Sequence, residues 1–339
     1  MHSASNDSYA RGFLLVLLAA FCYGLQPLFA QYAYAGGANP VGLLLVRFLI
    51  AASILLLFLR LRGIALPNWK LAGQNFLLGV GYGLSALGYY SASHSTSVSL
   101  AVILTFSFPA FVTLLSILYL GERARPMKLL SLALAFAGVL LATGLSFHGK
   151  VSGVLWALFS ALAYGTAIVY GTHRIRHEQP LASATVVLLG CAATFAVAAL
   201  YSGAALPSGG SAWWATLGLA LFATILPVSA FLAGSPHIGS SSAAILSNLE
   251  PVVAVTIAVL VIGEPMSSGI LGGGLLVLVA AVILASQGRR DATAPVALLW
   301  RVSRTTPSSF RGYGEGRASR CALLFWRAFS GSRCARRTR

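Results

Sequence analysis

Charged residues are scarce in this chain. Only 9% of its 339 residues are Asp, Glu, Lys or Arg, whereas a soluble domain carries about 25%. Hydrophobic residues make up 58% of the chain, which is more apolar side chain than one soluble core could bury. Most of this surface must therefore face lipid, and the composition excludes an ordinary soluble domain.

Sequence features of cofactor and metal chemistry are also missing. The four cysteines have no metal-binding or redox spacing, and two of them lie inside apolar runs, which argues against a disulfide framework. The sequence has no G-x-S-x-G or H-E-x-x-H motif and no paired acids within its apolar runs. We therefore expect no cofactor, no metal site and no catalytic residues.

Nucleic-acid binding is not expected either, although the net charge is +16. Twelve of the 23 basic residues, all of them arginines, fall within residues 287–339. The remainder of the chain has no basic stripe that is separate from long apolar runs. The excess charge is thus a property of the tail.

Apolar runs of about 20 residues dominate the rest of the sequence. A helix of that length spans the hydrocarbon core of a bilayer. Glycines inside the runs lack the strand-turn-helix context of a phosphate loop and fit close helix packing better. The sequence predicts an all-α integral membrane protein with ten transmembrane helices, near residues 12–34, 41–60, 71–91, 97–119, 126–145, 151–172, 181–202, 212–233, 240–262 and 268–287.

Half of the chain repeats the other half. Ser93–Glu122 matches Ser235–Glu264 without a gap at an offset of 142, and nine of thirty positions are identical. Ala20–Gly24 matches Ala161–Gly165 at an offset of 141. Two independent matches at nearly one offset indicate that five spans were duplicated. We expect five-helix repeats at 12–145 and 151–287, followed by a basic tail at 288–339.

The distribution of basic residues predicts the orientation of the spans. With both termini inside, the inner segments of residues 1–290 hold eleven Lys and Arg residues and the outer loops hold only Lys150. Because five is an odd number, the two repeats then cross the bilayer in opposite directions. Inverted repeats are typical of secondary transporters, whose binding site lies near the midplane where the halves meet.

Each copy of the long repeat has a proline near the middle of its apolar run, Pro109 or Pro251, and ends in Gly-Glu. We expect these prolines to break their helices and to take part in gating. Neighbouring helices can satisfy the backbone groups that a proline leaves free in a membrane. Glu122 and Glu264 are expected to be exposed stops at helix ends.

Together these features resemble the EamA-type exporters of the drug/metabolite transporter superfamily. The resemblance covers about residues 12–287 and implies a secondary transporter, usually an exporter, of small metabolites or amphipathic compounds. Tyr23 stands where the family often has tryptophan, and Gln26-Pro27 is less usual. The matching segments are Phe21–Gly24, Arg47-Phe48, Tyr90–Ser93, Pro109 with Gly121–Arg123, Leu249–Pro251, and Gly263–Pro265.

Glu250 is the strongest candidate for chemistry. It lies about ten residues into the ninth predicted span, which at 1.5 Å per residue is roughly 15 Å deep and near the midplane. A carboxylate at that depth normally faces a cavity or a partner. Either it couples proton movement to transport or binds a cationic substrate, or it is a structural acid that bonds the backbone opened by Pro251.

Arg47 lies roughly 9–10 Å into the second predicted span. It could bind a substrate carboxylate or pair with Glu250, and a direct pair would favour the charged carboxylate and weaken the case for a proton carrier. The alternative is an arginine whose long side chain reaches the outer interface. Further candidates for substrate binding or coupling are the mid-span polar and aromatic residues Asn248, Gln26, Tyr23, Tyr89, Tyr90 and Tyr164.

The sequence therefore predicts a secondary transporter in the inner or plasma membrane. Its partners are a small-molecule substrate and the lipid bilayer, with protons as the suggested coupling ion, and it acts as a monomer or a homodimer. A membrane enzyme, a channel and a structural membrane protein are the alternatives. The tail, rich in arginine and without lysine, is either a basic segment lying on the inner leaflet or a disordered, non-native extension, and we favour the extension.

Overall fold

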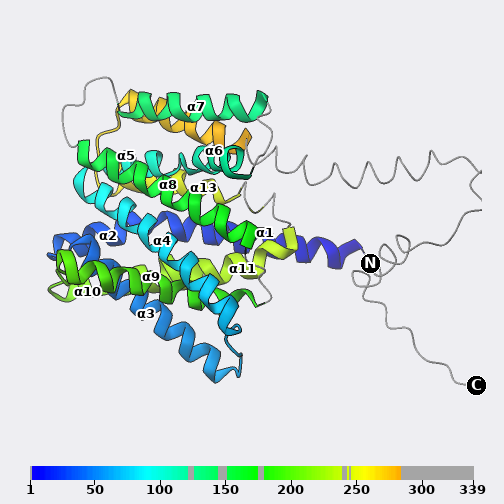
Figure 1. The fold of residues 1–339 in the computed structure, drawn as a ribbon. Helices are drawn as coiled ribbons and strands as arrows, with labels where there is room; N and C mark the ends of the chain where they lie inside the picture. Colours follow the sequence, from blue (N-terminus) through cyan, green and yellow to red (C-terminus); the bar gives the residue numbers. More distant parts are fainter. Residues whose placement is uncertain are drawn as a thin grey trace, which may run out of the picture. The chain divides into compact units, whose positions relative to one another are not determined.

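The computed structural model describes residues 2–120, 126–143, 151–174, 179–238, 243 and 246–283. Every regular element in these residues is a helix, as the composition predicts. The predicted tail at 288–339 lies outside the described residues. The elements are α1 (His2–Gly24), α2 (Gln26–Ala35), α3 (Pro40–Leu61), α4 (Trp69–Ser95), α5 (Val98–Thr105), α6 (Phe108–Leu120), α7 (Pro126–Thr143), α8 (Val151–Arg174), α9 (Pro180–Ser202), α10 (Gly210–Ala220), the π-helix η1 (Leu221–Ile225), α11 (Leu226–Ile238), α13 (Leu249–Leu260) and a last helix over Ser268–Ile283 (Figure 1).

Helices lie along all ten of the predicted apolar runs. Among the described residues, six helical stretches are long and apolar enough to cross a membrane. Three further apolar helices are shorter, at Pro126–Ala142, Leu249–Leu260 and Ser268–Ile283. The six stretches are Tyr9–Ala35, Pro40–Leu61, Val98–Tyr119, Val151–Gly171, Pro180–Ser202 and Gly210–Ile238.

Interruptions in the long apolar helices lie just before Pro27, Pro109 and Pro251. The first span breaks at Leu25 between α1 and α2, because Pro27 has no N–H to bond the Tyr23 carbonyl four residues earlier. Pro109 and Pro251 follow turns in their apolar runs, at residues 106–107 and 248. They stand in the first turns of α6 and α13, where a missing N–H costs little because those donors have no helical partner anyway.

The two repeats exchange their first helices. α1 packs along α11 and against α13, and α8 packs along α4 and against α6. A Cβ added to Gly24 would lie 2.5 Å from Val253 Cβ, and one added to Gly165 would lie 3.2 Å from Phe111 Cβ. Val253 and Phe111 occupy corresponding positions of the two copies of the long repeat. The same contact is therefore made twice, each time across the boundary between the repeats.

Helices that hold the same place in the two repeats also pack against each other. α3 packs on α9. α7 lies beside the last helix (Figure 1), with a Cβ added to Gly138 only 2.7 Å from the Gly273 carbonyl. Such contacts between small residues are how helices associate closely in lipid, where burial of apolar surface gives little driving force.

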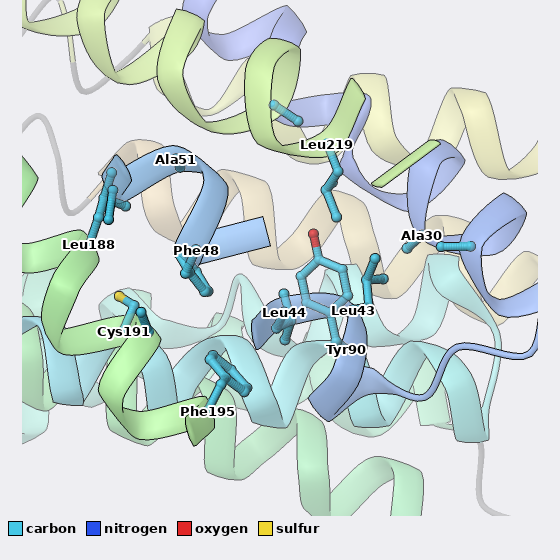
Figure 2. Packing of buried hydrophobic residues seen from close by; sticks show 14 of the residues in the cluster. Ala30, Leu43, Leu44, Phe48, Ala51, Tyr90, Leu188, Cys191, Phe195 and Leu219 are labelled. Carbon is cyan, nitrogen blue, oxygen red and sulfur yellow. The ribbon is translucent and has the colours of Figure 1, made fainter. Parts of the chain in front are cut away.

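A large apolar cluster holds α3, α4 and α9 together (Figure 2). Phe48 of α3 stacks on Phe195 of α9 with ring centroids 5.6 Å apart. Tyr90 of α4 is 1% exposed within the same cluster, and its hydroxyl points toward Leu219 of α10 (Figure 2). This packing fixes the face of α3 that carries Arg47.

The N-terminus of α5 is capped by a residue of the other repeat. Glu264 accepts hydrogen bonds from the backbone N–H groups of Val98 (2.6 Å) and Ser99 (3.0 Å) and from the Ser99 hydroxyl (2.9 Å). Ser97 caps the next N–H, that of Leu100, at 3.2 Å. The expectation that Glu264 is an exposed stop is wrong, because unpaired N–H groups and the helix dipole attract a carboxylate. Glu122 lies outside the described residues.

Candidate functional site

Arg47 is the centre of a buried polar network. The side chain is 5% exposed. Its Nε donates to Thr224 Oγ1 at 2.7 Å and its Nη1 donates to the Tyr90 hydroxyl at 2.6 Å. Its Nη2 donates to Gln26 Oε1 at 3.0 Å and to the Ala223 carbonyl at 3.1 Å. Four of the five donors of the guanidinium are thus used within the protein.

The π-helix η1 provides two of these acceptors, the Ala223 carbonyl and the Thr224 hydroxyl. Pro227 has no N–H, so the Ala223 carbonyl, four residues earlier, lacks its α-helical partner and accepts from Arg47 instead. Thr224 donates its hydroxyl hydrogen to the Leu219 carbonyl at 2.9 Å and so presents a lone pair to Arg47. Single π-turns within α-helices occur frequently at functional sites.

Gln26 links Arg47 to Glu250. Its Oε1 accepts from Arg47 and from the Tyr90 hydroxyl at 3.1 Å. Its Nε2 donates to Glu250 Oε1 at 3.4 Å. The helix break before Gln26 places this amide between the two charged groups, and no direct ion pair between Arg47 and Glu250 is present in the described structure. The chain of contacts joins α2, α3 and α4 of the first repeat to η1 and α13 of the second.

Glu250 lies in the first turn of α13 and is half-buried. Among the described residues, Gln26 is its hydrogen-bond donor, and Oε2 receives no hydrogen bond. Its carboxylate interacts electrostatically with Arg47. A set of tyrosines from α1, α4 and α8 lies within electrostatic range of the same carboxylate, namely Tyr23, Tyr89, Tyr90 and Tyr164.

Aromatic rings continue the site on the side of the first repeat. Tyr164 meets Phe108 edge-on with centroids 4.6 Å apart, and Tyr82 lies 5.4 Å from Tyr164. Phe108 occupies the position in the first repeat that Glu250 occupies in the second. The two copies of the duplicated stretch thus bring an acid and an aromatic ring to one group of tyrosines.

The structure brings most of the predicted site residues together. Arg47 is buried and turned inward, which contradicts the alternative of a side chain that reaches the interface. Glu250 receives a side-chain hydrogen bond, whereas the structural alternative predicted bonding to the backbone. Asn248 is the N-cap of α13 but makes no capping hydrogen bond, and within the described part of the chain it is not joined to the network. The roles of these residues in transport remain predictions.

Sequence reasoning missed Thr224, the Ala223 carbonyl and Phe108. One signal was present for the Ala223 carbonyl, because a proline at 227 inside an apolar run frees the carbonyl four residues earlier. The position of η1 opposite Arg47 depends on how the repeats pack, which the sequence does not state.

Comparison with known proteins agrees with the repeat and the fold. The model of the EamA-like transporter family matches residues 10–144 and again residues 151–286. The chain is 30% identical over 255 residues to "Uncharacterized inner membrane transporter YedA" of Escherichia coli K12, covering 72% of this chain and 80% of that one. It is 27% identical over 270 residues to an "Uncharacterized transporter" of Archaeoglobus fulgidus, covering 79% and 94%.

A crystal structure with 18% sequence identity superposes with a TM-score of 0.59, covering 83% of this chain and 98% of that one. At that identity the likeness shows the fold alone. The family match extends over both repeats, as do the membrane-length apolar helices. The chain is therefore a multi-pass membrane protein that belongs to the EamA-like transporter family.

Proposed function

We propose that this protein is a secondary transporter that exports a small metabolite or amphipathic compound by alternating access of two inverted five-helix repeats. The observation that carries the proposal is the hydrogen-bonded chain from η1 through Arg47 and Gln26 to Glu250. It crosses the boundary between the repeats, where the sites of inverted-repeat transporters lie. Relatives named as transporters favour this function over a membrane enzyme or a channel.

In this proposal the chain crosses the membrane ten times with both termini inside. Helices along all ten apolar runs support the number, and the excess of basic residues in the predicted inner segments supports the orientation. The protein acts in the inner or plasma membrane, which agrees with the name of its Escherichia coli relative. Both halves of the site come from one chain, so a monomer or a homodimer can work.

Glu250 is the proposed coupling group. A carboxyl group that alternates between charged and neutral forms changes its attraction to Arg47 and to the Gln26 amide that joins them. Because the amide also bonds Arg47, the change reaches α3 and η1. Proton movement would thereby bias the relative positions of the two repeats, which is what coupling requires.

The test begins with wild-type protein reconstituted into liposomes. Amino acids, nucleobases and cationic dyes are first screened for compounds that raise its unfolding temperature. A stabilising compound should then accumulate in proteoliposomes under a pH gradient, and more slowly in protein-free liposomes. If no compound is moved faster than in protein-free liposomes, the proposal of a transporter is wrong.

The proton-coupling step is tested with Glu250→Gln and its matched control Glu250→Asp. The Gln variant should keep its unfolding temperature and elution profile but lose accumulation driven by the pH gradient, because the amide cannot bind or release a proton at neutral pH. The Asp variant should retain gradient-driven accumulation. A Gln variant that still concentrates substrate against its gradient would show that Glu250 does not couple protons.

A further inference from the structure

The charged groups of the site differ in how far they are already engaged. Arg47 uses donors on all three of its nitrogens within the protein and is 5% exposed. One N–H of Nη1 is left over, so a substrate carboxylate or phosphate that bound Arg47 through two hydrogen bonds would have to displace Gln26, Tyr90 or an acceptor of η1. Buried donors and acceptors that lose their partners are costly, so anion binding here is opposed.

Glu250, in contrast to Arg47, has hydrogen-bonding capacity to spare. It is half-buried, its one described hydrogen bond is long at 3.4 Å, and its Oε2 is without a donor among the described residues. A carboxylate so placed can accept a charge-assisted hydrogen bond from an ammonium group, which is roughly twice as strong as a neutral one. Glu250 Oε2 is therefore available to a ligand, whereas the Arg47 guanidinium is mostly engaged by the protein.

The surroundings of Glu250 suit the apolar body of an organic cation. Tyr23, Tyr89 and Tyr164 lie within electrostatic range of Glu250 and are half-buried, so part of each residue is not covered by protein. Phe108 adds an aromatic ring against Tyr164. Aromatic faces attract cations through their quadrupole, and they also accept flat apolar groups.

We propose that the site selects amine-bearing cations, with the ammonium group bound to Glu250 Oε2 and the apolar part packed among these rings. Anions bind weakly because most donors of Arg47 are already engaged. This inference rests on the proposed function, since it names the class of substrate that the transporter carries. Arg47 is then a positioning residue, which holds Gln26 and Tyr90 in place beside Glu250.

The test compares ligands that share a frame and differ in charge. Tyramine, tyrosol and 4-hydroxyphenylacetate carry an amine, an alcohol and a carboxylate on similar aromatic frames, and butylamine, butanol and butyrate do so on a small aliphatic one. Binding to the purified full chain is measured by calorimetry at neutral pH. On at least one frame the amine should bind about tenfold or more tightly than the alcohol, which corresponds to about 1.4 kcal/mol, and the carboxylate should bind most weakly.

Glu250→Gln should bring amine and alcohol to equal affinity, whereas Glu250→Asp should keep the preference for the amine. Equal binding of amine and alcohol by the wild type on both frames, or tighter binding of a carboxylate, would overturn the inference whether or not the Gln variant folds. If liposomes containing the protein transport a compound without this preference, the proposed function stands and the substrate class is wrong. If the amine binds but is never moved across the membrane, the proposed function is wrong instead.

Discussion

Glu264 provides the most direct test of how the two repeats are held together. Its carboxylate closes the N-terminus of α5 through hydrogen bonds from the Val98 N–H, the Ser99 N–H and the Ser99 hydroxyl. Removing a side-chain cap costs about 0.5–2 kcal/mol, and a hydrogen bond to a charged group contributes about 1.5–3 kcal/mol. Because Glu264 is half-buried, water replaces part of what is lost, and we expect Glu264→Ala to destabilise the protein by about 2 kcal/mol.

Two milder substitutions should give smaller losses. Glu264→Gln keeps one acceptor oxygen but removes the charge, and should cost about 1 kcal/mol. Ser99→Ala removes one of the three hydrogen bonds and leaves both backbone N–H groups paired, and should cost about 0.5–1 kcal/mol. Ser267→Ala is the matched control in the same connection, because it removes a local cap, the 3.1 Å bond from the Ile270 N–H, without touching α5.

Thermal unfolding in detergent, followed by tryptophan fluorescence at constant pH, gives the order of stability. The expected order of destabilisation is Glu264→Ala, then Glu264→Gln, then Ser99→Ala. An unfolding temperature of the Ala variant equal to that of the wild type would show that the cap does not stabilise the contact between the repeats. A loss in Ser99→Ala as large as in Glu264→Ala would mean that the hydroxyl, and not the carboxylate, carries the effect.

Substitutions at Gly24 and Arg47 and a truncation of the tail test other parts of the protein. Gly24→Ala should destabilise by about 1–3 kcal/mol and more than Gly165→Ala, since its Cβ would lie 2.5 Å rather than 3.2 Å from the neighbouring Cβ; equal unfolding temperatures would contradict the packing. Arg47→Lys should lower the unfolding temperature and weaken the preference for amine over alcohol, because one ammonium cannot replace a guanidinium that serves four acceptors. An unchanged preference would refute the positioning role. Truncation after Gly288 should leave insertion and transport unchanged, since the family match ends at residue 286, and loss of either would show that the tail is needed.

The helical class and the duplication could be predicted because they depend on local patterns. Apolar runs of membrane length predict helices whatever they pack against. The constant offset between the two copies of the repeat pairs Glu250 with Phe108 from the sequence alone. The number of spans, their orientation and the repeat boundaries stay predictions.

The connections within the site could not be predicted, because they depend on which helices meet. Gln26 was one of several mid-span polar residues, and its place between Arg47 and Glu250 follows from the break at Leu25 and from the packing of α1 on α13. Glu264 appeared to end a helix, yet its partners are 165 and 166 residues away in the sequence. Contacts of this range are absent from any local pattern.

The exchange of first helices has a consequence for synthesis. α1 is made first, but the residue that a side chain at Gly12 would meet, His237, belongs to the second repeat and is made much later. At a translation rate of roughly 5–20 residues per second, that interval is on the order of ten to fifty seconds. During that interval, the face of α1 that packs on α11 and α13 lacks both of these partners. The first half of the chain is thus an assembly intermediate rather than a finished unit, and the packing of α1 is complete only after α11 and α13 have been synthesised.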